Sequence, residues 1–436
     1  MRISVIGLGK LGAPLAAALA SKGHAVVGVD LNPEYVRLLS AGRAPVDEPQ
    51  LQDLIDAGRA RLRATGSYSE AVRDSDLSII IVPTPSGADG AFSNQFVIAA
   101  VKEIGLALRS KPDYHVVSVT STVMPGATGG EIRAALETAS GRKVGEDVGL
   151  CYNPEFVALG SVVRDLLKPE MVLIGQSDAR AGDVLEKLYL EFCEQKAPVA
   201  RMNLVNAEIT KIALNTFVTT KITYANMLSG ICERLPGGDV DVVTATLGLD
   251  SRIGRRYLQG AIGYGGPCFP RDNVAFALLA KRVGARADIA EATDQLNRHQ
   301  IERLFSAASD RLPAGASISV LGLSYKPDTG VIDESQGVAL VKRLAEAGYK
   351  VAAYDPLALP NARAALGACF AAAESAEACV RGADRVIVTT AWPQFRDIPA
   401  AAYARANSRI EVVDCWRILD PARIGSSCTL VYPGRA

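Results

Sequence analysis

The sequence of 436 residues predicts an α/β fold in which two doubly wound parallel-sheet domains are joined by a central helical domain with one long helix. Three observations predict this fold: a glycine turn between an apolar run and a helix near the N-terminus, a proline-free middle stretch, and a partial repeat of the N-terminal pattern after residue 315. The length of the chain also favours several domains, because a single hydrophobic core rarely serves more than about 250–300 residues. We expect the domains to span 1–198, 199–300 and 301–436.

Composition excludes several classes of partner. The 47 basic and 47 acidic residues balance, so no excess charge favours nucleic acid or an acidic membrane surface. Eight cysteines are scattered without a CxxC pair, so we expect neither a metal site nor a disulfide framework. The N-terminus shows no signal peptide, and no run approaches the roughly 20 apolar residues of a membrane span. These features predict a cytoplasmic protein.

The N-terminal segment combines a strand, a glycine turn and a helix. The apolar run 3–6 precedes Gly7, Leu8, Gly9, Lys10, Leu11 and Gly12, and an Ala/Leu-rich helix continues to about Ser21. This order presents helix N–H groups to a pyrophosphate, as in Rossmann-like units. The next strand, 25–29, ends in Asp30, whose carboxylate can accept from the ribose hydroxyls of NAD and repel the extra phosphate of NADP. The sequence predicts NAD binding here, with a structural tight turn as the alternative.

Two further strands, 78–82 and 116–119, end in polar turns. Pro83, Thr84 and Pro85 follow the first strand, and Ser121 and Thr122 follow the second. Ligands of doubly wound sheets lie at the carboxyl ends of the strands, so these side chains are candidates for contact with cofactor or substrate. Ordinary Ser/Thr caps on the following helices are the alternative. Glu155 follows an Asn-Pro turn and, taken alone, is typical of a solvated loop residue.

The middle of the chain predicts helices. No proline interrupts 203–233, which favours one helix of about eight turns, and a further helix is expected over 273–283. Lys211 and Asn215 are spaced i, i+4 and therefore share a face of the long helix. Such a pair is more often solvated surface than part of a site.

A glycine-rich loop carries one thiol. Cys268 follows Gly263, Gly265 and Gly266, glycines that allow close approach to a ligand, and precedes Asp272 by four residues. A thiolate attacks carbonyl carbon, and a carboxylate so placed can orient or deprotonate a water molecule. The alternative is a turn with a structural cysteine.

The C-terminal third repeats the N-terminal pattern. Residues 318–323 repeat 3–8, residues 348–355 parallel 23–30, and residues 380–388 parallel 72–80. The repeat predicts a second Rossmann-like unit, with Ser324 in place of Gly9 and no glycine at the third position, so we expect no dinucleotide there in the usual manner. The first two matches differ in offset by ten residues, which places an inserted loop around 326–335.

Taken together, these motifs resemble the UDP-glucose/GDP-mannose dehydrogenase family from Ile3 to about Trp416. The motifs that carry the resemblance are Gly7 to Gly12 with Asp30, Val82-Pro-Thr-Pro85, Ser121-Thr122-Val123, Asn153-Pro-Glu-Phe156, Lys211-Ile-Ala-Leu-Asn215, Asp250-Ser-Arg-Ile-Gly254, Gly263 to Asp272, Lys326-Pro-Asp-Thr329 and Tyr354-Asp-Pro356.

The resemblance implies a four-electron reaction. The family oxidises the C6 alcohol of a nucleotide sugar to a carboxylate with two NAD per turnover. By motif, Cys268 resembles the nucleophile that captures the C6 aldehyde as a thiohemiacetal, which is then oxidised to a thioester. Lys211 resembles the cation that stabilises the developing alkoxide. Asn215 resembles the residue that holds the sugar or the adjacent water.

The resemblance also implies the remaining site residues. Asp272 and Thr122 are similar to the groups that position the proton-accepting water, and Glu155 to the carboxylate of thioester hydrolysis. Arg252 resembles a residue donated across a dimer interface. The substrate-binding set implied in this way is Glu155, Phe156, Lys211, Asn215, Arg252, Gln259, Tyr264, Gly265 and Lys326. A homodimer or higher homo-oligomer is expected, and capsule, exopolysaccharide or small-molecule biosynthesis all suit the product.

Three positions depart from the family pattern. Leu159 stands where a second glutamate is common, Asp333 where an arginine precedes Glu-Ser, and Pro267 where a serine precedes the cysteine. The first two are expected near the nicotinamide side of NAD, and the proline removes one N–H donor.

The identity of the substrate is left open by the sequence. Cys268-Phe-Pro resembles the pattern of family members that act on UDP-glucose or GDP-mannose more than that of members that act on UDP-N-acetylhexosamines. The resemblance therefore implies UDP-glucose as the first expected substrate, with UDP-glucuronate as the product. Other hypotheses are a two-electron β-hydroxyacid-type dehydrogenase, which explains neither the repeat nor the cysteine, and a non-catalytic nucleotide-binding regulator.

Overall fold

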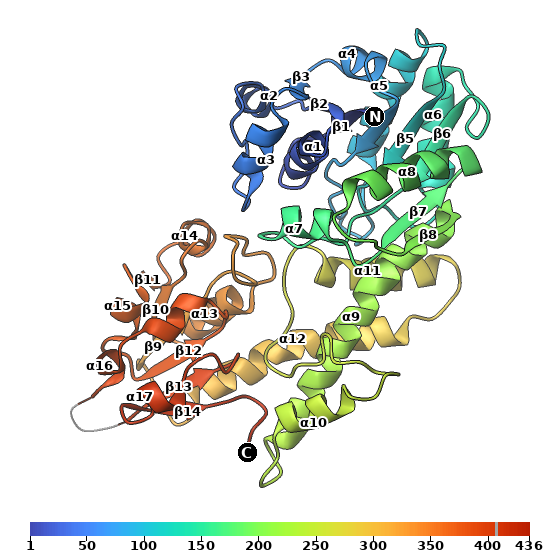
Figure 1. Cartoon of the computed structure of the whole chain (residues 1–436). Coiled ribbons are helices and arrows are strands. Elements are labelled where there is room, and N and C mark those ends of the chain that lie inside the picture. The colour runs from blue at the N-terminus through green and yellow to red at the C-terminus, as the bar shows by residue number, and fades with distance from the viewer. Residues whose placement is uncertain (406–408) are drawn as a thin grey trace. The chain divides into compact units, whose positions relative to one another are not determined.

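The computed structural model describes residues 1–405 and 409–436. The chain divides into two compact units, Met1–Ala213 and Leu214–Ala436, and the boundary falls inside the long helix α9, Leu204–Cys232 (Figure 1). Each unit is built around its own β-sheet. The three-domain division at 198 and 300 stays a prediction.

The first unit contains an eight-stranded sheet in the order β3-β2-β1-β4-β5-β6-β7-β8, parallel except between β6 and β7. Its strands are β1 Arg2–Ile6, β2 Ala25–Val29, β3 Leu62–Thr65, β4 Leu77–Ile80, β5 His115–Val119, β6 Val148–Tyr152, β7 Val172–Gln176 and β8 Val199–Asn203. Most central strands are buried along their whole length, which explains their continuous apolar runs.

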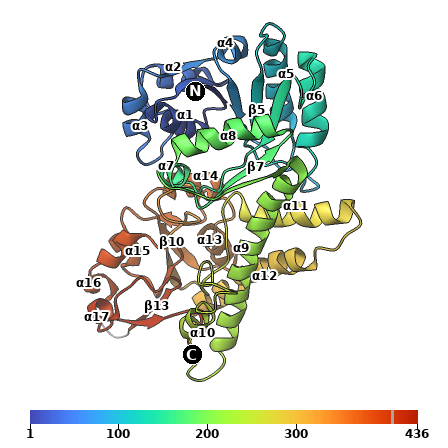
Figure 2. The same ribbon diagram turned by 45° about the vertical axis from the view of Figure 1, so that its right-hand side comes forward.

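Helices cover both faces of this sheet (Figure 2). The helices are α1 Gly12–Ser21, α2 Pro33–Ser40, α3 Leu51–Gly58, α4 Tyr68–Arg73, α5 Gln95–Leu108, the π-helical turn η1 Thr128–Ile132, α6 Arg133–Ser140, α7 Val162–Leu167 and α8 Ala179–Phe192. Helices α1, α3, α7 and α8 pack on one face, and α4, α5 and α6 pack on the other. The predicted doubly wound architecture is confirmed.

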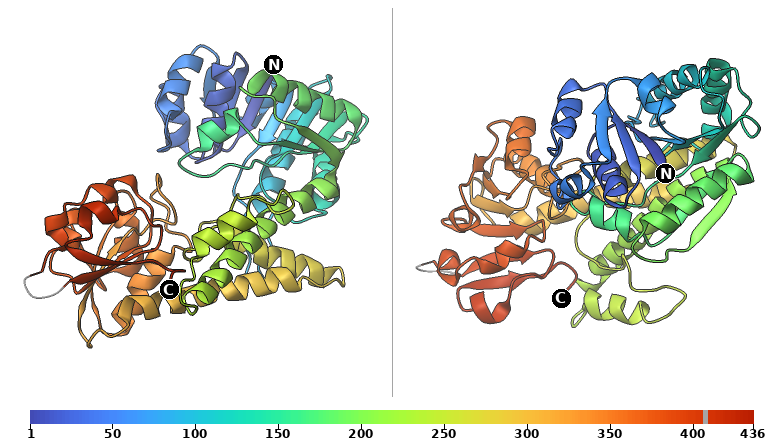
Figure 3. Two further views of the ribbon diagram at one scale, coloured as in Figure 1. Left: turned by 60° about the horizontal axis from the view of Figure 1, so that its bottom comes forward. Right: turned by 45° about the horizontal axis from the view of Figure 1, so that its top comes forward.

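The second unit joins helices to a six-stranded parallel sheet in the order β11-β10-β9-β12-β13-β14 (Figure 3). The strands are β9 Ser317–Leu321, β10 Lys350–Tyr354, β11 Ala371–Ala372, β12 Arg385–Val388, β13 Ile410–Asp414 and β14 Cys428–Val431. The helices after α9 are α10 Val240–Leu247, α11 Phe269–Arg282, α12 Asp288–Ser309, α13 Gln336–Glu346, α14 Leu359–Leu366, α15 Ala376–Val380, the 3-10 turn η2 Pro393–Asp397, α16 Ala400–Tyr403 and α17 Pro421–Ile424.

The predicted helices of the middle region are present, and the largest difference is the start of the second one. Helix α9 has 29 residues, in agreement with the proline-free stretch. Helix α11 begins at Phe269, four residues before the expected start, because Pro270 lies in the first turn, where a backbone N–H has no intrahelical partner to lose. Cys268 consequently occupies the N-cap of α11.

The internal repeat is confirmed at the level of individual hydrogen bonds. Leu8 N donates to Asp30 Oδ2 at 2.6 Å, and Leu323 N donates to Asp355 Oδ2 at 2.7 Å. The glycines that precede these leucines share a positive φ, 99° in Gly7 and 108° in Gly322. The two strand-to-helix turns therefore begin alike.

The structure supplies the third glycine of the repeat from a position outside the sequence match, since Pro327 occupies the matching position. A Cβ on Gly12 would lie 1.8 Å from the carbonyl oxygen of Gly7, and a Cβ on Gly337 would lie 2.2 Å from that of Gly322. Gly337 therefore takes the structural place of Gly12. It stands fifteen positions after Gly322, whereas Gly12 stands five after Gly7, so the predicted ten-residue insertion hides the equivalence.

No helix among residues 1–405 and 409–436 is long and apolar enough to cross a lipid bilayer.

Candidate active site

The glycine turn of the first unit has the geometry of a dinucleotide site. A Cβ added to Gly9 would meet nothing within 4 Å, whereas Gly12 is packed against the Gly7 backbone. Leu11 lies at the N-cap of α1 and has no side-chain acceptor. In the first turn, Ala13 N donates to the carbonyl of Gly9 at 3.1 Å and Pro14 has no N–H, so of these first-turn residues Gly12 supplies the N–H donor for an anion. The turn is thus open where a pyrophosphate would approach and closed where the helix meets the strand.

Asp30 is held at the carboxyl end of β2. Its Oδ2 accepts from Leu8 N, and its Oδ1 accepts from Asn32 N at 2.7 Å. Both bonds use backbone donors, which fix the carboxylate beside the turn and leave further lone pairs for ribose hydroxyls. The residues of the first unit therefore fit NAD.

The hydroxyl-bearing turns after β4 and β5 brace each other. Thr84 Oγ1 donates to the carbonyl of Thr122 at 2.7 Å, and Ser121 Oγ donates to the carbonyl of Val82 at 2.7 Å. Neither bond caps a helix. The Thr84 and Ser121 hydroxyl hydrogens are used within the protein, so these residues shape the end of the sheet. Thr122, which follows Ser121, is half-buried.

Lys211 and the Asn-Pro-Glu-Phe turn lie together in the first unit. Lys211 Nζ donates to the carbonyl of Glu155 and lies 4.6 Å from the ring centroid of Phe156. The Lys211 residue is only 7% exposed, so its charge acts in a partly desolvated setting where cation–π attraction is strengthened.

A small cavity adjoins Glu155. Its volume is about 10 Å³, and Glu155, Asn153 and Thr120 supply polar groups to its lining. A site of this size holds about one water molecule when polar partners line it. Asn153 is fixed by Tyr189, whose hydroxyl donates to Oδ1 at 2.7 Å, and by its own bond to Leu173.

In the second unit, Asn215 and Asp272 form a buried pair. Asn215 Nδ2 donates to Asp272 Oδ2 at 2.6 Å, and Asp272 is 1% exposed. Arg271 Nε lies 3.5 Å from Asp272 Oδ1. Asp272 also lies in the first turn of α11, where the helix dipole favours an anion.

Cys268 is exposed directly before this turn. Its carbonyl accepts from Asp272 N at 2.8 Å, which closes the first turn of α11. A sulfur at a helix N-terminus is favoured as the anion, the nucleophilic form of cysteine. The second unit therefore combines an accessible sulfur with a buried, oriented carboxylate one helical turn away.

The glycines before Cys268 approach protein rather than open space. A Cβ on Gly265 would lie 2.3 Å from the carbonyl oxygen of Glu334, and one on Gly266 would lie 2.7 Å from the ring of Tyr325. Gly266 N also donates to the carbonyl of Asp333 at 2.8 Å. The inserted loop after β9 thus supports the cysteine loop, and that packing requires the glycines.

The chain is similar to a known family of proteins over each of its parts. The chain matches the UDP-glucose/GDP-mannose dehydrogenase family over residues 1–193 for its NAD binding domain, 205–299 for its central domain and 319–421 for its UDP binding domain. The chain belongs to this family.

Individual members are similar over most of their length. UDP-glucose 6-dehydrogenase AglM of Haloferax volcanii is 36% identical over 400 residues, 91% of this chain and 92% of that protein. GDP-mannose 6-dehydrogenase of Pseudomonas putida is 35% identical over 362 residues, 81% of each chain. A solved UDP-glucose dehydrogenase from Pyrobaculum islandicum superposes with a TM-score of 0.89 at 35% identity and covers 100% of this chain and 98% of its own.

Two departures from the family pattern have structural roles here. Leu159 is half-buried and packs on the apolar core of the first unit. Asp333 is exposed, and its carbonyl oxygen accepts the Gly266 bond. Pro267 is exposed immediately before Cys268.

The other candidate substrate-binding residues differ in their exposure to solvent. Arg252 is exposed, with 87% of its side chain accessible, and pairs with Asp250 at 2.6 Å. Gln259 is exposed and Lys326 is half-buried. Tyr264 is buried, burial raises the pKa of its hydroxyl, and that hydroxyl accepts from Asn273 Nδ2 at 3.3 Å.

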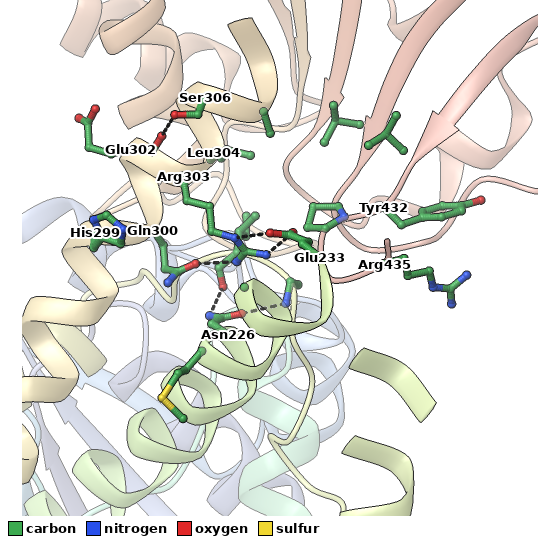
Figure 4. A pocket seen from close by; sticks show the side chains of 18 of the residues that line it. Asn226, Glu233, His299, Gln300, Glu302, Arg303, Leu304, Ser306, Tyr432 and Arg435 are labelled. Carbon is green, nitrogen blue, oxygen red and sulfur yellow. Dashed lines mark hydrogen bonds and ion pairs between the residues drawn. The ribbon is translucent and has the colours of Figure 1, made fainter. Parts of the chain in front are cut away.

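A large cavity of the second unit is separate from these groups. Its volume is about 740 Å³, and helices α9 and α12, strand β13 and the C-terminal tail line it (Figure 4). Cys268 and Asp272 do not line this cavity, so the size of the cavity does not identify it as the place of the reaction.

Sequence reasoning missed three polar residues next to the cysteine loop: Thr219, Asn226 and Asn297. A signal existed for the first two. They stand four and eleven residues after Asn215, on one face of α9.

Proposed function

We propose that this dehydrogenase converts UDP-glucose to UDP-glucuronate by oxidising C6 twice through a covalent bond to Cys268. The observation that carries the proposal is the exposed Cys268 sulfur at the N-cap of α11, one turn from an Asp272 carboxylate held by Asn215. The 36% identity to a UDP-glucose 6-dehydrogenase supports the choice of sugar.

NAD, when bound, supplies the hydride acceptor for both oxidations. Gly7 to Gly12 would hold its pyrophosphate and Asp30 its ribose hydroxyls, as the open space at Gly9 and the fixed carboxylate support. We further assign Pro83, Thr84, Pro85, Ser121 and Thr122 to the wall of the cofactor site.

Lys211 is proposed to stabilise negative charge on the C6 oxygen. As the alcohol loses its proton, an alkoxide develops, and a fixed cation in a desolvated site lowers the energy of that charge. The low exposure of Lys211 and its anchoring to the Glu155 carbonyl support this role, because an anchored ammonium needs no reorganisation.

Cys268 is proposed to hold the substrate between oxidations. Its sulfur attacks the C6 aldehyde to give a thiohemiacetal, and oxidation of this adduct gives a thioester. Water then cleaves the carbon–sulfur bond and releases the acid. We assign Glu155 to this hydrolysis, which the water-sized cavity that Glu155 helps to line supports.

Asp272 is proposed to position the water that accepts the alcohol proton. Its Oδ2 is occupied by Asn215, so the amide fixes the orientation of the carboxylate. Thr122 is a second proposed holder of this water. Phe156, Gln259, Tyr264, Gly265 and Lys326 are proposed to line the site of the nucleotide sugar.

We also propose that the protein works as a homodimer in the cytoplasm. Phe217, Tyr224 and Ile231 follow one another at intervals of seven on α9 and are exposed, Phe217 by 68%. Exposed apolar stripes of this kind mark protein interfaces. In the dimer, Arg252 would bind the sugar-phosphate held by the partner subunit.

The dimer is tested by light scattering on Phe217→Asp and Tyr224→Asp. We expect the wild type to have the mass of two chains and the double variant that of one. A double variant that keeps the mass of two chains would contradict an interface on this face of α9.

The reaction is tested with purified protein, NAD and a panel of UDP-glucose, GDP-mannose and UDP-N-acetylhexosamines. We expect two NADH per UDP-glucose and a uronate identified by mass. Cys268→Ala should make almost no acid, with Cys193→Ala as the control because Cys193 lies at the C-cap of α8 and not in the cysteine loop. One NADH per sugar with an aldehyde or ketone product would refute the proposal.

GDP-mannose is the second candidate substrate. The relative from Pseudomonas putida, 35% identical, supports it. A higher kcat/KM for GDP-mannose than for UDP-glucose in the same panel would select it, whereas bound NAD without turnover of any sugar would favour a regulator.

A further inference from the structure

Helix α9 presents a row of buried polar side chains to the cysteine loop. Asn215, Thr219 and Asn226 share one face, and eleven residues of helix span about 16 Å. All three side chains bond to residues between Ala261 and Asn273. The helix therefore runs alongside the whole segment that contains Cys268.

Asn226 holds the start of this segment by two bonds. Its Oδ1 accepts from Ala261 N at 2.9 Å, and its Nδ2 donates to the carbonyl of Ile262 at 2.9 Å (Figure 4). The residue is 2% exposed. One amide side chain thus pairs with a loop backbone as a neighbouring strand would, and satisfies two buried polar groups.

Asn297 does the same from helix α12. Its Oδ1 accepts from Tyr264 N at 2.8 Å, and its Nδ2 donates to the Tyr264 carbonyl at 3.0 Å. A Cβ on Gly263 would lie 2.8 Å from Asn297 Oδ1, so the loop can approach this amide only with glycine there.

The end of the segment is fixed by the same face of α9. Asn273 Nδ2 donates to Thr219 Oγ1 at 2.9 Å, next to the bond between Asn215 and Asp272. Cys268 lies between these two attachment regions, so its position relative to Asp272 depends on both.

We propose that Asn226 and Asn297 are positioning residues that hold the cysteine loop in its reactive conformation. The kinetic part of this inference rests on the proposed function. Both residues bond to the backbone of the loop rather than to Cys268 itself, so their loss should lower kcat while NAD binding by the first unit is kept.

Amide hydrogen exchange of the full chain tests whether Asn226 and Asn297 hold the loop, and this measurement does not require catalytic turnover. We expect Asn226→Ala and Asn297→Ala each to speed exchange at residues 261–264 at least 10-fold, with exchange in β1 and β9 unchanged. Exchange at 261–264 equal to the wild type would overturn the proposal, even in a protein inactive on every sugar.

Kinetics then test the consequence. We expect kcat to fall 10- to 100-fold in each variant, the KM for NAD to change less than 2-fold, and the double variant to lose less than the product of the two losses, because both residues hold one loop. Thr223→Val is the matched control: it lies on the same face of α9, and Thr223 Oγ1 has no hydrogen-bond partner among the described residues.

Variants that still fold can distinguish a role in positioning Cys268 from a role in stability alone. Asn226→Asp and Asn297→Asp keep the size and the acceptor but lose the donor, and they replace the alanine variants if those do not fold. Faster loop exchange with unchanged kcat in the Asp variants, or a lower melting temperature with unchanged kcat, would show a merely structural role.

Discussion

Asn215 Nδ2 donates a 2.6 Å hydrogen bond to Oδ2 of Asp272, and both side chains are buried. The pair therefore sets the orientation of a carboxylate one turn from Cys268. Hydrogen bonds to charged groups are worth about 1.5–3 kcal/mol, so this bond is strong enough to hold a single rotamer.

This pair leads to the first prediction. Asp272→Asn should lower kcat by roughly 10²–10⁴-fold, because the carboxylate proposed to position the proton-accepting water is removed, and Asn215→Ala should lower it less, because the carboxylate remains but loses its orientation. Steady-state kinetics with saturating NAD measure both. An Asp272→Asn enzyme with more than half of the wild-type kcat would refute the assigned role.

Two glycines of the dinucleotide turn should respond differently to alanine. Gly9→Ala should fold normally and raise the KM for NAD, because its Cβ enters open space that the pyrophosphate needs. Gly12→Ala should lower the melting temperature, because its Cβ would lie 1.8 Å from a backbone oxygen. Thermal unfolding and NAD titration separate the two effects, and equal melting temperatures would contradict the geometry.

Asp30 and Asp355 provide a matched pair. Asp30→Ala should raise the KM for NAD about 10-fold, or about 1.4 kcal/mol, and weaken discrimination against NADP. Asp355 is 2% exposed, and its Oδ2 already accepts from Leu323 N, Ser324 and Trp392.

Asp355→Ala should therefore cost stability and leave the KM for NAD unchanged. Losing several bonds to a buried carboxylate is expected to cost at least about 2 kcal/mol of unfolding free energy. Urea unfolding and NAD kinetics on both variants measure this; an effect of Asp355→Ala on NAD affinity would contradict the division between the two units.

His115 predicts a dependence of stability on pH. Burial, with Lys111 nearby, lowers the pKa of His115 to about 3. The folded chain keeps the ring neutral while the unfolded chain binds a proton below about pH 6.5, so stability present at pH 7 is lost as pH falls from 6.5 towards 3, by up to about 1.4 kcal/mol per pH unit.

The measurement is urea unfolding at pH 7, 6 and 5 for the wild type and His115→Gln. We expect a shallower loss between pH 6 and 5 in the variant, which has no ring to protonate. Circular dichroism at pH 7 confirms that both are folded. Parallel losses in the two proteins would show that other groups control the acid range.

The sequence was most informative where local pattern and fold coincide. The strand, turn and helix around Gly7, the acidic residue Asp30 and the long α9 all follow from spacing, because backbone conformation and apolar periodicity are local properties. The second sheet followed from repeated strands for the same reason.

Other features depend on contacts between residues that are far apart in the sequence. Gly337 was not recognised as a partner of Gly322, because ten inserted residues separate positions that only packing brings together. The amides of Asn226 and Asn297 pair with backbone far away in sequence, and an asparagine inside a helix gives no sign of its partner. The glycines near Cys268 were read as space for a ligand, whereas Tyr325 and Glu334 occupy part of that space.

The insertion between Gly322 and Gly337 also separates the uses of the two similar strand-to-helix turns. The turn at Gly7 is open at Gly9, whereas the turn at Gly322 continues into residues that pack on the cysteine loop. Glu334 and Tyr325, which belong to the longer turn, pack against Gly265 and Gly266 and so support the loop that carries Cys268. Removing those ten residues would not create a second coenzyme site, because the Trp392 indole and the Leu323 backbone N–H already donate to the Asp355 carboxylate. It would also remove residues that pack against the loop of Cys268.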